Sequence, residues 1–150
     1  MMVQFKTVKR LEDVDIKLPE RSTTNSAGYD FFAYTDTVIP AGAVTRINTG
    51  VKCKLMPDMF LMLANRSSNP SRKGLVLMNG VGIIDADYYE NPDNDGEMAF
   101  EFYNITDTDV EIKKGDKLGQ GIIMKFIKTD DDYIANPDAT RAGGFGSTGV

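Results

Sequence analysis

Short runs of apolar and β-branched residues alternate with polar positions along most of the chain. They include the segments VTRI, VKCKL, MFLML and GEMAFEFYNI, and breaks such as PAG, NTG and MPD separate them. Alternation with period two places apolar side chains on one face of a strand, and Gly, Pro, Asn and Asp favour the turns between strands. No long segment has helical periodicity. The pattern therefore predicts an all-β protein.

The two ends of the chain differ in character. Residues 1–8 alternate loosely and predict a first strand, and VEIKKGDKLGQGIIMKFI predicts a hairpin followed by another strand. In that last strand one face is predicted to carry alternate residues: Leu118, Gln120, Ile122, Met124 and Phe126. After residue 128 the chain becomes acidic and then rich in Gly. We expect one domain over residues 1–150, with a β core in 1–128 and an acidic linker and flexible arm in 129–150.

Composition excludes several classes of function. The formal net charge is -5, which argues against general binding to nucleic acid polymers, because that affinity comes from Lys and Arg on phosphates. There is no run of 18 apolar residues, and the start, MMVQFKTVKR, lacks the apolar stretch of a signal peptide, so we expect a soluble, intracellular protein without a membrane partner. Cys53 is the only cysteine and there is no histidine, which excludes an internal disulfide, a His-dependent triad and a His/Cys zinc site. Any metal would be a hard ion bound by oxygen.

The segment NGVGIIDADY carries two acids and an aromatic residue directly after an apolar run. On a strand, Asp85 and Asp87 would share one face, with Ile84 and Ala86 on the other. This arrangement predicts an acid held at the rim of the core, followed by Tyr88. The alternative is a hairpin with solvated aspartates.

The segment NRSSNPSRKG has the groups of a phosphate site. Pro70 suits the start of a helical turn, Asn69 and the serines before it suit a cap, and Arg66 adds positive charge in an acidic chain. A solvated polar loop is the alternative. Asp30, in AGYDFFA, is either a turn aspartate or a functional acid. Gln120 requires a hydrogen-bond partner, which is either a ligand or the backbone.

The C-terminal segment RAGGFGSTGV cannot form a core of its own. It does carry a cation, an aromatic ring and hydroxyl groups, in Arg141, Phe145, Ser147 and Thr148. These groups could contact a terminal phosphate and a base, so the segment is either a disordered end or a mobile lid.

Five motifs in order, AGYD, RSS with a following KG, NGVGIIDADY, GDKLGQ and GGFGSTG, resemble the trimeric dUTPase family of bacterial or phage type, from residue 27 to the C-terminus. The resemblance implies an antiparallel jelly-roll fold and a homotrimer with active sites between subunits, each closed by a C-terminal tail. It also implies a cytoplasmic enzyme that hydrolyses dUTP to dUMP and pyrophosphate with the assistance of Mg²⁺.

The resemblance further implies roles for individual residues. Asp85 corresponds to the general base that activates water for attack on the α-phosphorus and contacts the 3'-hydroxyl, and Gln120 would help to place phosphate or water. Tyr88 would stack under deoxyribose and exclude a 2'-hydroxyl, and Asp30 would lie near the metal, reached through water. The uracil edge would be recognised by Asn79 and by the backbone of a turn that includes Gly82, Ile83 and Ile84. The remaining substrate contacts would be Arg66, Ser67 and Ser68 to the α- and β-phosphates, Arg141, Ser147 and Thr148 to the γ-phosphate, and Phe145 with the adjoining Gly146 over the uracil.

Some positions depart from the family pattern, and two alternatives remain open. Lys117 and Gly119 stand where the family more often has Arg and Ala, and the spacing of RAGGFG makes Arg141 the weakest of the γ-phosphate assignments. A dCTP deaminase shares the fold and an RSS-like phosphate site. A phage regulatory protein that binds a protein partner besides dUTP is the other alternative, and for it the loop of residues 89–97 is the first candidate contact.

Overall fold

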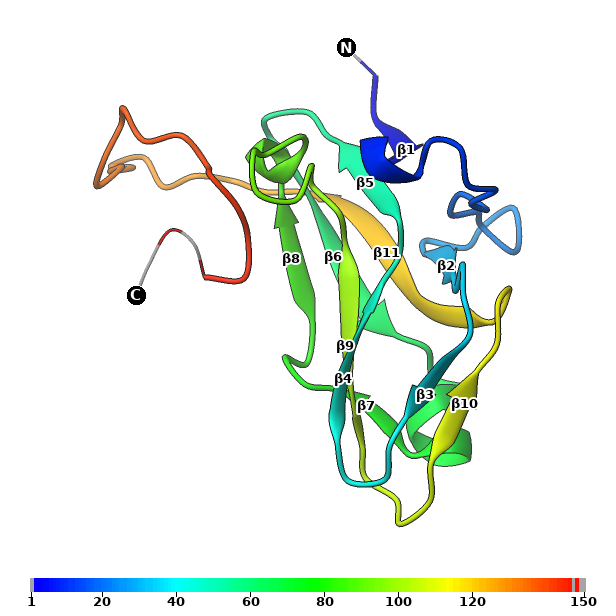
Figure 1. The fold of residues 1–150 in the computed structure, drawn as a ribbon. Coiled ribbons are helices and arrows are strands. Elements are labelled where there is room, and N and C mark those ends of the chain that lie inside the picture. Colours follow the sequence, from blue (N-terminus) through cyan, green and yellow to red (C-terminus); the bar gives the residue numbers. More distant parts are fainter. Residues whose placement is uncertain (1, 147, 149–150) are drawn as a thin grey trace.

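The computed structural model describes residues 2–146 and 148, and strands joined by turns dominate it (Figure 1). All strand pairings among these residues are antiparallel. The prediction of an antiparallel all-β fold is therefore confirmed. No helix in the described part of the chain is long and apolar enough to cross a membrane.

The largest sheet has four strands in the order β2-β11-β6-β8. Their bounds are Tyr29–Phe32 for β2, Lys117–Lys125 for β11, Met59–Asn65 for β6 and Gly82–Asp85 for β8. The segment MFLML forms most of β6, and its alternation places Leu61 and Leu63 in the core. β8 and β2 are the two edge strands of this sheet, so residues of β8 and residues of β2 lie at opposite edges of it.

Three smaller sheets complete the fold. One has the order β4-β9-β7, with bounds Val44–Asn48, Ala99–Asn104 and Leu75–Leu77. The other two are strand pairs, β1 (Gln4–Thr7) with β5 (Val51–Lys54) and β3 (Thr37–Ile39) with β10 (Val110–Ile112). Most of these pairings join strands that are distant in sequence.

Aromatic side chains from different sheets form the centre of the core. Phe31 of β2 meets Phe100 of β9 edge to face, with ring centroids 5.6 Å apart, and Phe100 stacks on Phe102 at 6.1 Å. All three are at most 1% exposed, and such pairs each contribute about 0.5–1.5 kcal/mol beyond their burial. Cys53 of β5 is also buried, and burial raises the pKa of its thiol to about 12.

Three short helical turns interrupt the strands: η1 (Lys9–Leu11), η2 (Asn69–Lys73) and η3 (Ala86–Tyr88). The helical turn predicted at Pro70 is present as η2, but no side chain caps it. Asn69 lies inside the turn instead, and its amide donates hydrogen bonds to Oδ1 of Asn65 and to the carbonyl of Leu118. Gly74 ends η2 with φ at +64°, a left-handed conformation that favours glycine.

Two local predictions for the last strands were wrong. β10 pairs with β3 and not with β11, so there is no β10-β11 hairpin. A register shift between Lys117 and Gly119 turns Leu118 into the core, where it is 1% exposed, while Met124 is exposed. The predicted face from Leu118 to Phe126 is broken because a bulge of this kind reverses the alternation.

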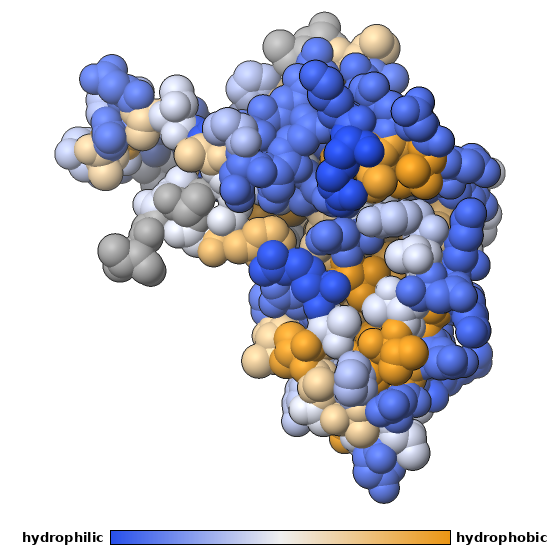
Figure 2. All heavy atoms as spheres, viewed as in Figure 1, coloured by the Kyte–Doolittle hydropathy of each residue, from blue (hydrophilic) through white to orange (hydrophobic). Residues whose placement is uncertain are grey.

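The C-terminal segment leaves β11, passes beyond β8 and folds back beside it (Figure 1, orange to red). The space-filling view shows it projecting from a body whose visible surface is mostly hydrophilic, with apolar side chains in separate patches (Figure 2). No strand forms after residue 125 in the described part of the chain.

Candidate active site

A cavity of about 260 Å³ lies beside β8. Residues of β6, β8 and the start of β9 line it, together with the returning tail, and they include Leu63, Asn79, Gly82, Ile83, Ile84, Asp85, Tyr88, Met98, Ala99, Arg141, Gly144, Phe145 and Gly146. Cavities that hold drug-sized ligands usually measure roughly 300–1,000 Å³. The cavity therefore suits a nucleoside, and a triphosphate attached to it would extend outside.

The strand that borders the cavity offers free backbone groups. β8 pairs with β6 on one side, with Gly82 opposite Leu63 and Asp85 opposite Phe60. Among the described residues no strand pairs with its other edge. Edge strands present unpaired N–H and C=O groups, which can bind a planar ligand in the manner of an added strand.

Asp85 ends β8, and its side chain is half exposed at the rim of the cavity. The next three residues form η3 and do not continue the strand, so the strand alternation predicted through Asp87 was wrong. Both carboxylates nevertheless bind one side chain. Arg141 donates from Nη2 to Asp85 and from Nε to Asp87, each over 2.7 Å.

Tyr88 is the most enclosed of the predicted substrate contacts, with 6% of its surface exposed. Its hydroxyl donates to the carbonyl of Glu97 over 2.6 Å and accepts from the amide of Asn94 over 2.8 Å. Burial raises the pKa of this hydroxyl, while the hydrogen bond from Asn94 partly opposes the shift. The phenol is therefore neutral at physiological pH.

The tail closes over the cavity through small residues and one ring. Gly144 crosses the Tyr88 ring so closely that an added Cβ would lie 2.5 Å from Cε2 of that ring. Phe145 lines the cavity, and the guanidinium of Arg46 lies 3.8 Å from its ring centroid. Such a cation-π contact contributes about 0.5–1 kcal/mol when exposed. Gly146 also lines the cavity, Thr148 is exposed and does not line it, and Ser147 lies outside the described residues.

A second cluster surrounds Asp30 on β2. Its carboxylate accepts hydrogen bonds from Ser22 and from Lys117, whose Nζ lies 3.0 Å away. Burial raises the pKa of Asp30, but the bonds from Ser22 and Lys117 outweigh burial, aided by the nearby charge of Arg66, so the pKa lies below its ordinary value. Asp30 is thus a negatively charged group already paired with a lysine.

Gln120 lies opposite Asp30 on β11. Its amide donates to the carbonyl of Asn65 over 3.2 Å, so the backbone serves as one partner of this glutamine in the chain on its own. Gly28 leaves the space that the Gln120 side chain occupies, because a Cβ at residue 28 would overlap its Oε1. The carbonyl of the amide faces this glycine.

The phosphate segment adjoins the Asp30 cluster. Arg66 follows the end of β6 and is half-buried, Ser67 is exposed, and Ser68 precedes η2. None of these three residues lines the cavity beside β8.

Within one chain, the predicted site residues therefore form two groups, one at the cavity beside β8 and one around Asp30 on β2. β8 and β2 lie three strand spacings apart, or roughly 14 Å. Gln120 lies opposite Ala64 of β6, which is four residues along from Phe60, the partner of Asp85. Four residues of strand span roughly 13 Å, which places the Asp30 and Asp85 backbones roughly 19 Å apart. This distance is too long for both groups of one chain to contact the same phosphate directly.

The donor groups fit only one kind of metal site. No group of three or more His, Cys, Asp or Glu side chains in the described part of the chain is arranged to hold an ion. Magnesium usually retains several waters and is bound by one or two carboxylates together with substrate phosphates. Asp30 suits such an ion at a distance of one water, and a preformed cage is absent from the described residues.

Comparison with known proteins identifies the family. Residues 14–149 match the dUTPase family. The chain belongs to the dUTPase family. A deoxyuridine 5'-triphosphate nucleotidohydrolase of Lactococcus lactis subsp. lactis is 44% identical over 146 residues, covering 97% of each chain. Hydrolysis of dUTP is thus the activity of this chain, as the resemblance predicted.

Solved dUTPase structures share the fold. The crystal structure of a dUTPase from Streptococcus mutans has a TM-score of 0.79 and 42% identity, covering 84% of this chain and 98% of that one. The D95N mutant of a dUTPase from phage phi11 of Staphylococcus aureus, described with a structural Mg(II) ion, has a TM-score of 0.71 and 20% identity, covering 93% of this chain and 100% of that one. At that identity it supports the fold alone. The jelly-roll prediction is confirmed.

Sequence reasoning missed several residues at the two clusters. Met98 and Ala99 line the cavity, Ser22 bonds Asp30, Arg46 contacts Phe145 and Asn94 bonds Tyr88. The pairing of Asp30 with Lys117 was also not foreseen. No local pattern marked these residues; Arg46 and Lys117 reach their partners through the tertiary fold, and Ser22 and Asn94 through the course of their loops.

Proposed function

We propose that this dUTPase binds the uracil and deoxyribose of dUTP in the cavity beside β8 and attacks the α-phosphorus with a water activated by Asp85. The observation that carries this proposal is the position of Asp85, a strand-mounted carboxylate at the rim of a nucleoside-sized cavity. A general base must lie within hydrogen-bond reach of its water. The rim is where the α-phosphate of a bound nucleotide would emerge.

Base recognition is assigned to the edge of β8 and to Asn79. Uracil presents a donor between two acceptors, and the unpaired backbone groups of Gly82–Ile84 and the Asn79 amide can match that order. Cytosine presents a different pattern. A site built from buried donors and acceptors rejects such a base because its own groups would be left unpaired.

The phosphates require groups from outside this cavity. Arg66, Ser67, Ser68 and Gln120 do not line it, and Asp30, which lies opposite Gln120, is roughly 19 Å from Asp85 within one chain. We infer that a neighbouring subunit supplies them, in a homotrimer with sites between subunits. Arginine and serine donors would then hold the α- and β-phosphates by charge-assisted hydrogen bonds.

The tail acts as the lid in this proposal. Phe145 would cover the uracil, and Arg141 would exchange its carboxylate partners for the γ-phosphate, joined by Ser147 and Thr148. Closure excludes water and aligns the reacting groups, which is most of what phosphoryl transfer requires. In an assembled trimer the tail of one subunit could serve the site of another.

Magnesium is assigned to the phosphate end of the site. When bound, it would neutralise charge on the phosphates, and Asp30 would hold it through water. The lowered pKa of Asp30 supports this role, because the carboxylate stays charged over the physiological range. Lys117 would have to release Asp30 or share it with the hydrated ion.

These observations bear differently on the two alternative functions. The relatives reported above are dUTPases, and no observation favours the dCTP deaminase. A regulatory protein partner remains a proposal: most of the loop of residues 89–97 is turned inward, but Glu90, Pro92 and Asp93 are exposed and would form the contact. We further propose a cytoplasmic enzyme of a bacterial cell or its phage.

The test measures pyrophosphate release from dUTP, dTTP, dCTP and UTP, with and without magnesium. Wild-type protein should prefer dUTP, and ammonia released from dCTP would instead indicate a deaminase. Asp85→Asn should bind dUTP with little change and lose a factor of roughly 10²–10⁴ in turnover. Asp87→Asn is the matched control, since it also contacts Arg141 but does not line the cavity, and it should lose far less. Normal turnover by Asp85→Asn would exclude Asp85 as the base.

A further inference from the structure

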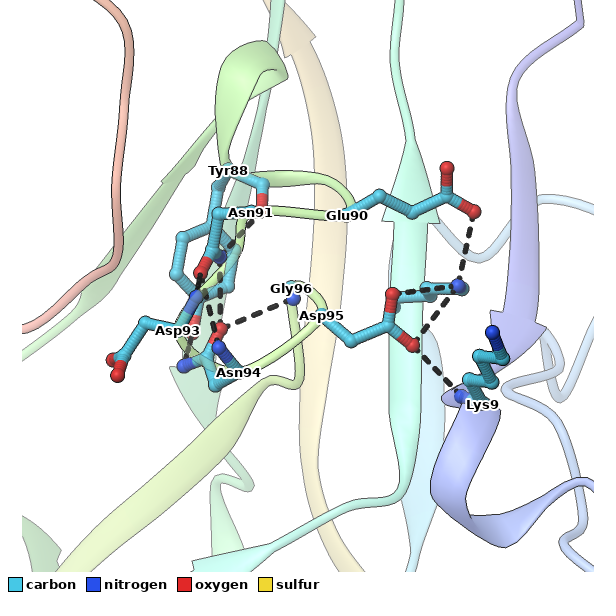
Figure 3. A network of polar contacts seen from close by, with 9 residues as sticks. Lys9, Tyr88, Glu90, Asn91, Asp93, Asn94, Asp95 and Gly96 are labelled. Atoms are coloured by element: carbon cyan, nitrogen blue, oxygen red, sulfur yellow. Dashed lines mark hydrogen bonds and ion pairs between the residues drawn. The ribbon is translucent and has the colours of Figure 1, made fainter.

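Polar contacts hold the loop of residues 89–97 on two sides, one toward Lys9 and one toward Tyr88 (Figure 3). Three of its residues, Glu90, Asp95 and Gly96, have positive φ angles of 55°, 60° and 82°. Non-glycine residues rarely adopt such angles unless their surroundings hold them there. The loop is therefore held in one conformation by its contacts.

One side of the loop is fixed to β5 and η1. The carboxylate of Asp95 accepts from Nζ of Lys52 over 3.0 Å and from the backbone N–H of Lys9 over 2.7 Å. Glu90 accepts a second bond from Lys52 over 3.0 Å. Burial lowers the pKa of Lys52, but the bonds to Asp95 and Glu90 outweigh burial and raise it. These contacts fix the outer side of the loop.

The other side of the loop faces Tyr88, and backbone donors determine how its amides are oriented. Oδ1 of Asn91 accepts from the N–H groups of Asp93 and Asn94, and Oδ1 of Asn94 accepts from the N–H of Gly96. A backbone N–H can only donate, so both amide oxygens must face these groups. The NH₂ group of Asn94 is consequently directed at the hydroxyl of Tyr88.

This orientation fixes the polarity of the Tyr88 hydroxyl. The hydroxyl accepts from Asn94, so its single hydrogen is free to donate to the carbonyl of Glu97. Asn91 reinforces the arrangement by donating to Oδ1 of Asn94 and to the carbonyl of Tyr88. The ring is thus held at its far end by the loop and at its near end by η3.

We propose that Asn94 is a positioning residue that fixes the Tyr88 ring and thereby sets the preference for deoxyribose over ribose. The inference rests on the proposed function, in which Tyr88 stacks under the sugar. A ring excludes a 2'-hydroxyl only if it cannot move aside by about the size of an oxygen atom, and functional groups must be held to within about 0.5 Å. Asn94 supplies that restraint.

The test compares kcat/KM for dUTP and UTP in two variants. Asn94→Asp retains the oxygen that accepts from Asn91 and Gly96 but replaces the NH₂ donor by a second acceptor oxygen. The single hydrogen of the Tyr88 hydroxyl then cannot serve both this oxygen and the carbonyl of Glu97, so one of the two hydrogen bonds of the hydroxyl is lost, whereas Asn94→Ala removes every contact of the amide. The kcat/KM for dUTP divided by that for UTP should fall by about three- to tenfold in Asn94→Asp, the range expected for the loss of one hydrogen bond. Asn94→Ala should lose at least as much selectivity and also stability.

Two further variants test whether a change in the kcat/KM ratio arises from the contact between Asn94 and Tyr88. Asn48→Asp adds the same charge at an exposed position of β4 and should leave the ratio unchanged. In a Tyr88→Phe background, Asn94→Asp should have no further effect on the ratio, because the hydroxyl through which Asn94 acts is gone. An equal effect with and without the hydroxyl would overturn the inference, as would an unchanged ratio in Asn94→Asp. If wild-type protein releases no pyrophosphate from dUTP, the proposed function itself fails.

Discussion

Nη2 of Arg141 lies 2.7 Å from a carboxylate oxygen of Asp85, so a cation of the tail covers the proposed base. The guanidinium is largely enclosed, with 16% of its side chain exposed, and a second bond to Asp87 holds it in place. An incoming triphosphate carries more negative charge than either carboxylate. Binding of dUTP can therefore draw Arg141 away and free Asp85 for its water.

Removal of the tail tests its role as a lid. Deletion of residues 141–150 should leave the oligomer unchanged, because none of the described residues in this range belongs to a sheet, and turnover of dUTP should fall at least tenfold. Size-exclusion chromatography and pyrophosphate release measure the two effects. Arg141→Ala in the full chain should lose less than the deletion, since Phe145 remains. A fully active truncated protein would refute the lid.

Gly144 provides a second test of closure. An Ala at this position would bring Cβ to 2.5 Å from the Tyr88 ring, so the tail could no longer cross the ring at its present distance. Gly144→Ala should raise KM for dUTP several-fold while the free energy of unfolding stays within about 0.5 kcal/mol. Thr140→Ala, an exposed change in the same segment, is the control. Wild-type kinetics in Gly144→Ala would show that the tail closes in another way.

The two acids that bind Lys52 should differ in their effect on stability. Asp95→Asn leaves a lysine that is 8% exposed with only one charged partner and should lower the free energy of unfolding by about 1–2 kcal/mol. Glu90→Gln should cost less than about 0.5 kcal/mol, because the Glu90 side chain is 54% exposed. Urea unfolding at one fixed protein concentration compares them. Equal losses would contradict the ranking.

The same ion pairs predict loss of stability in acid. Bonds from Lys52 and Tyr89 lower the pKa of Glu90, and for Asp95 the bonds from Lys9 and Lys52 outweigh burial and lower the pKa as well. A lowered pKa means stability that is present above the unfolded-state values of 4.5 and 3.8 and is lost as pH falls through the folded-state values.

Thermal unfolding from about pH 6 to about pH 3 checks this direction. The pKa of Asp30 is also lowered, so the Tm of the wild type alone would not isolate the ion pairs of Lys52. The informative quantity is therefore the difference in Tm between wild type and Lys52→Met, which should shrink toward low pH. Lys6→Met, an exposed change on β1, should give a small difference that does not depend on pH in this way. A constant Tm difference for Lys52→Met would argue against the pairing.

The surroundings of Gly119 leave no room for a side chain. A Cβ at this position would overlap the Phe100 ring and lie 2.9 Å from the carbonyl of Ala64. Gly119→Ala should therefore destabilise the protein by about 1–3 kcal/mol. Phe100→Leu should recover part of that loss in the double variant, measured as a non-additive free energy of unfolding. Simple additivity would mean that Phe100 is not the obstacle.

The sequence predicted strands better than strand partners. Alternation in MFLML located β6 and its buried face, because side-chain direction is a local property. The partner of β10 is set by packing of distant segments, so the expected hairpin did not form. The bulge that buries Leu118 likewise depends on the neighbouring β2, which no local pattern reveals.

For the candidate site, too, the sequence predicted individual residues better than their positions relative to one another. Motifs indicated Asp85, Tyr88 and Phe145, which line one cavity, and Asp30 with Gln120, which lie opposite each other on paired strands. The motifs could not show that the two groups are far apart in one chain. Contacts such as Arg141 to Asp85 depend on where the tail returns, and nothing in RAGGFG specifies that position.

The inert thiol of Cys53 makes this chain a convenient object for labelling. With its pKa near 12 and its sulfur buried, the native cysteine should resist maleimide reagents at neutral pH. A cysteine introduced at an exposed tail position would then be the sole reactive group. One fluorophore there could report the opening and closing of the segment during turnover, without removal of any native residue.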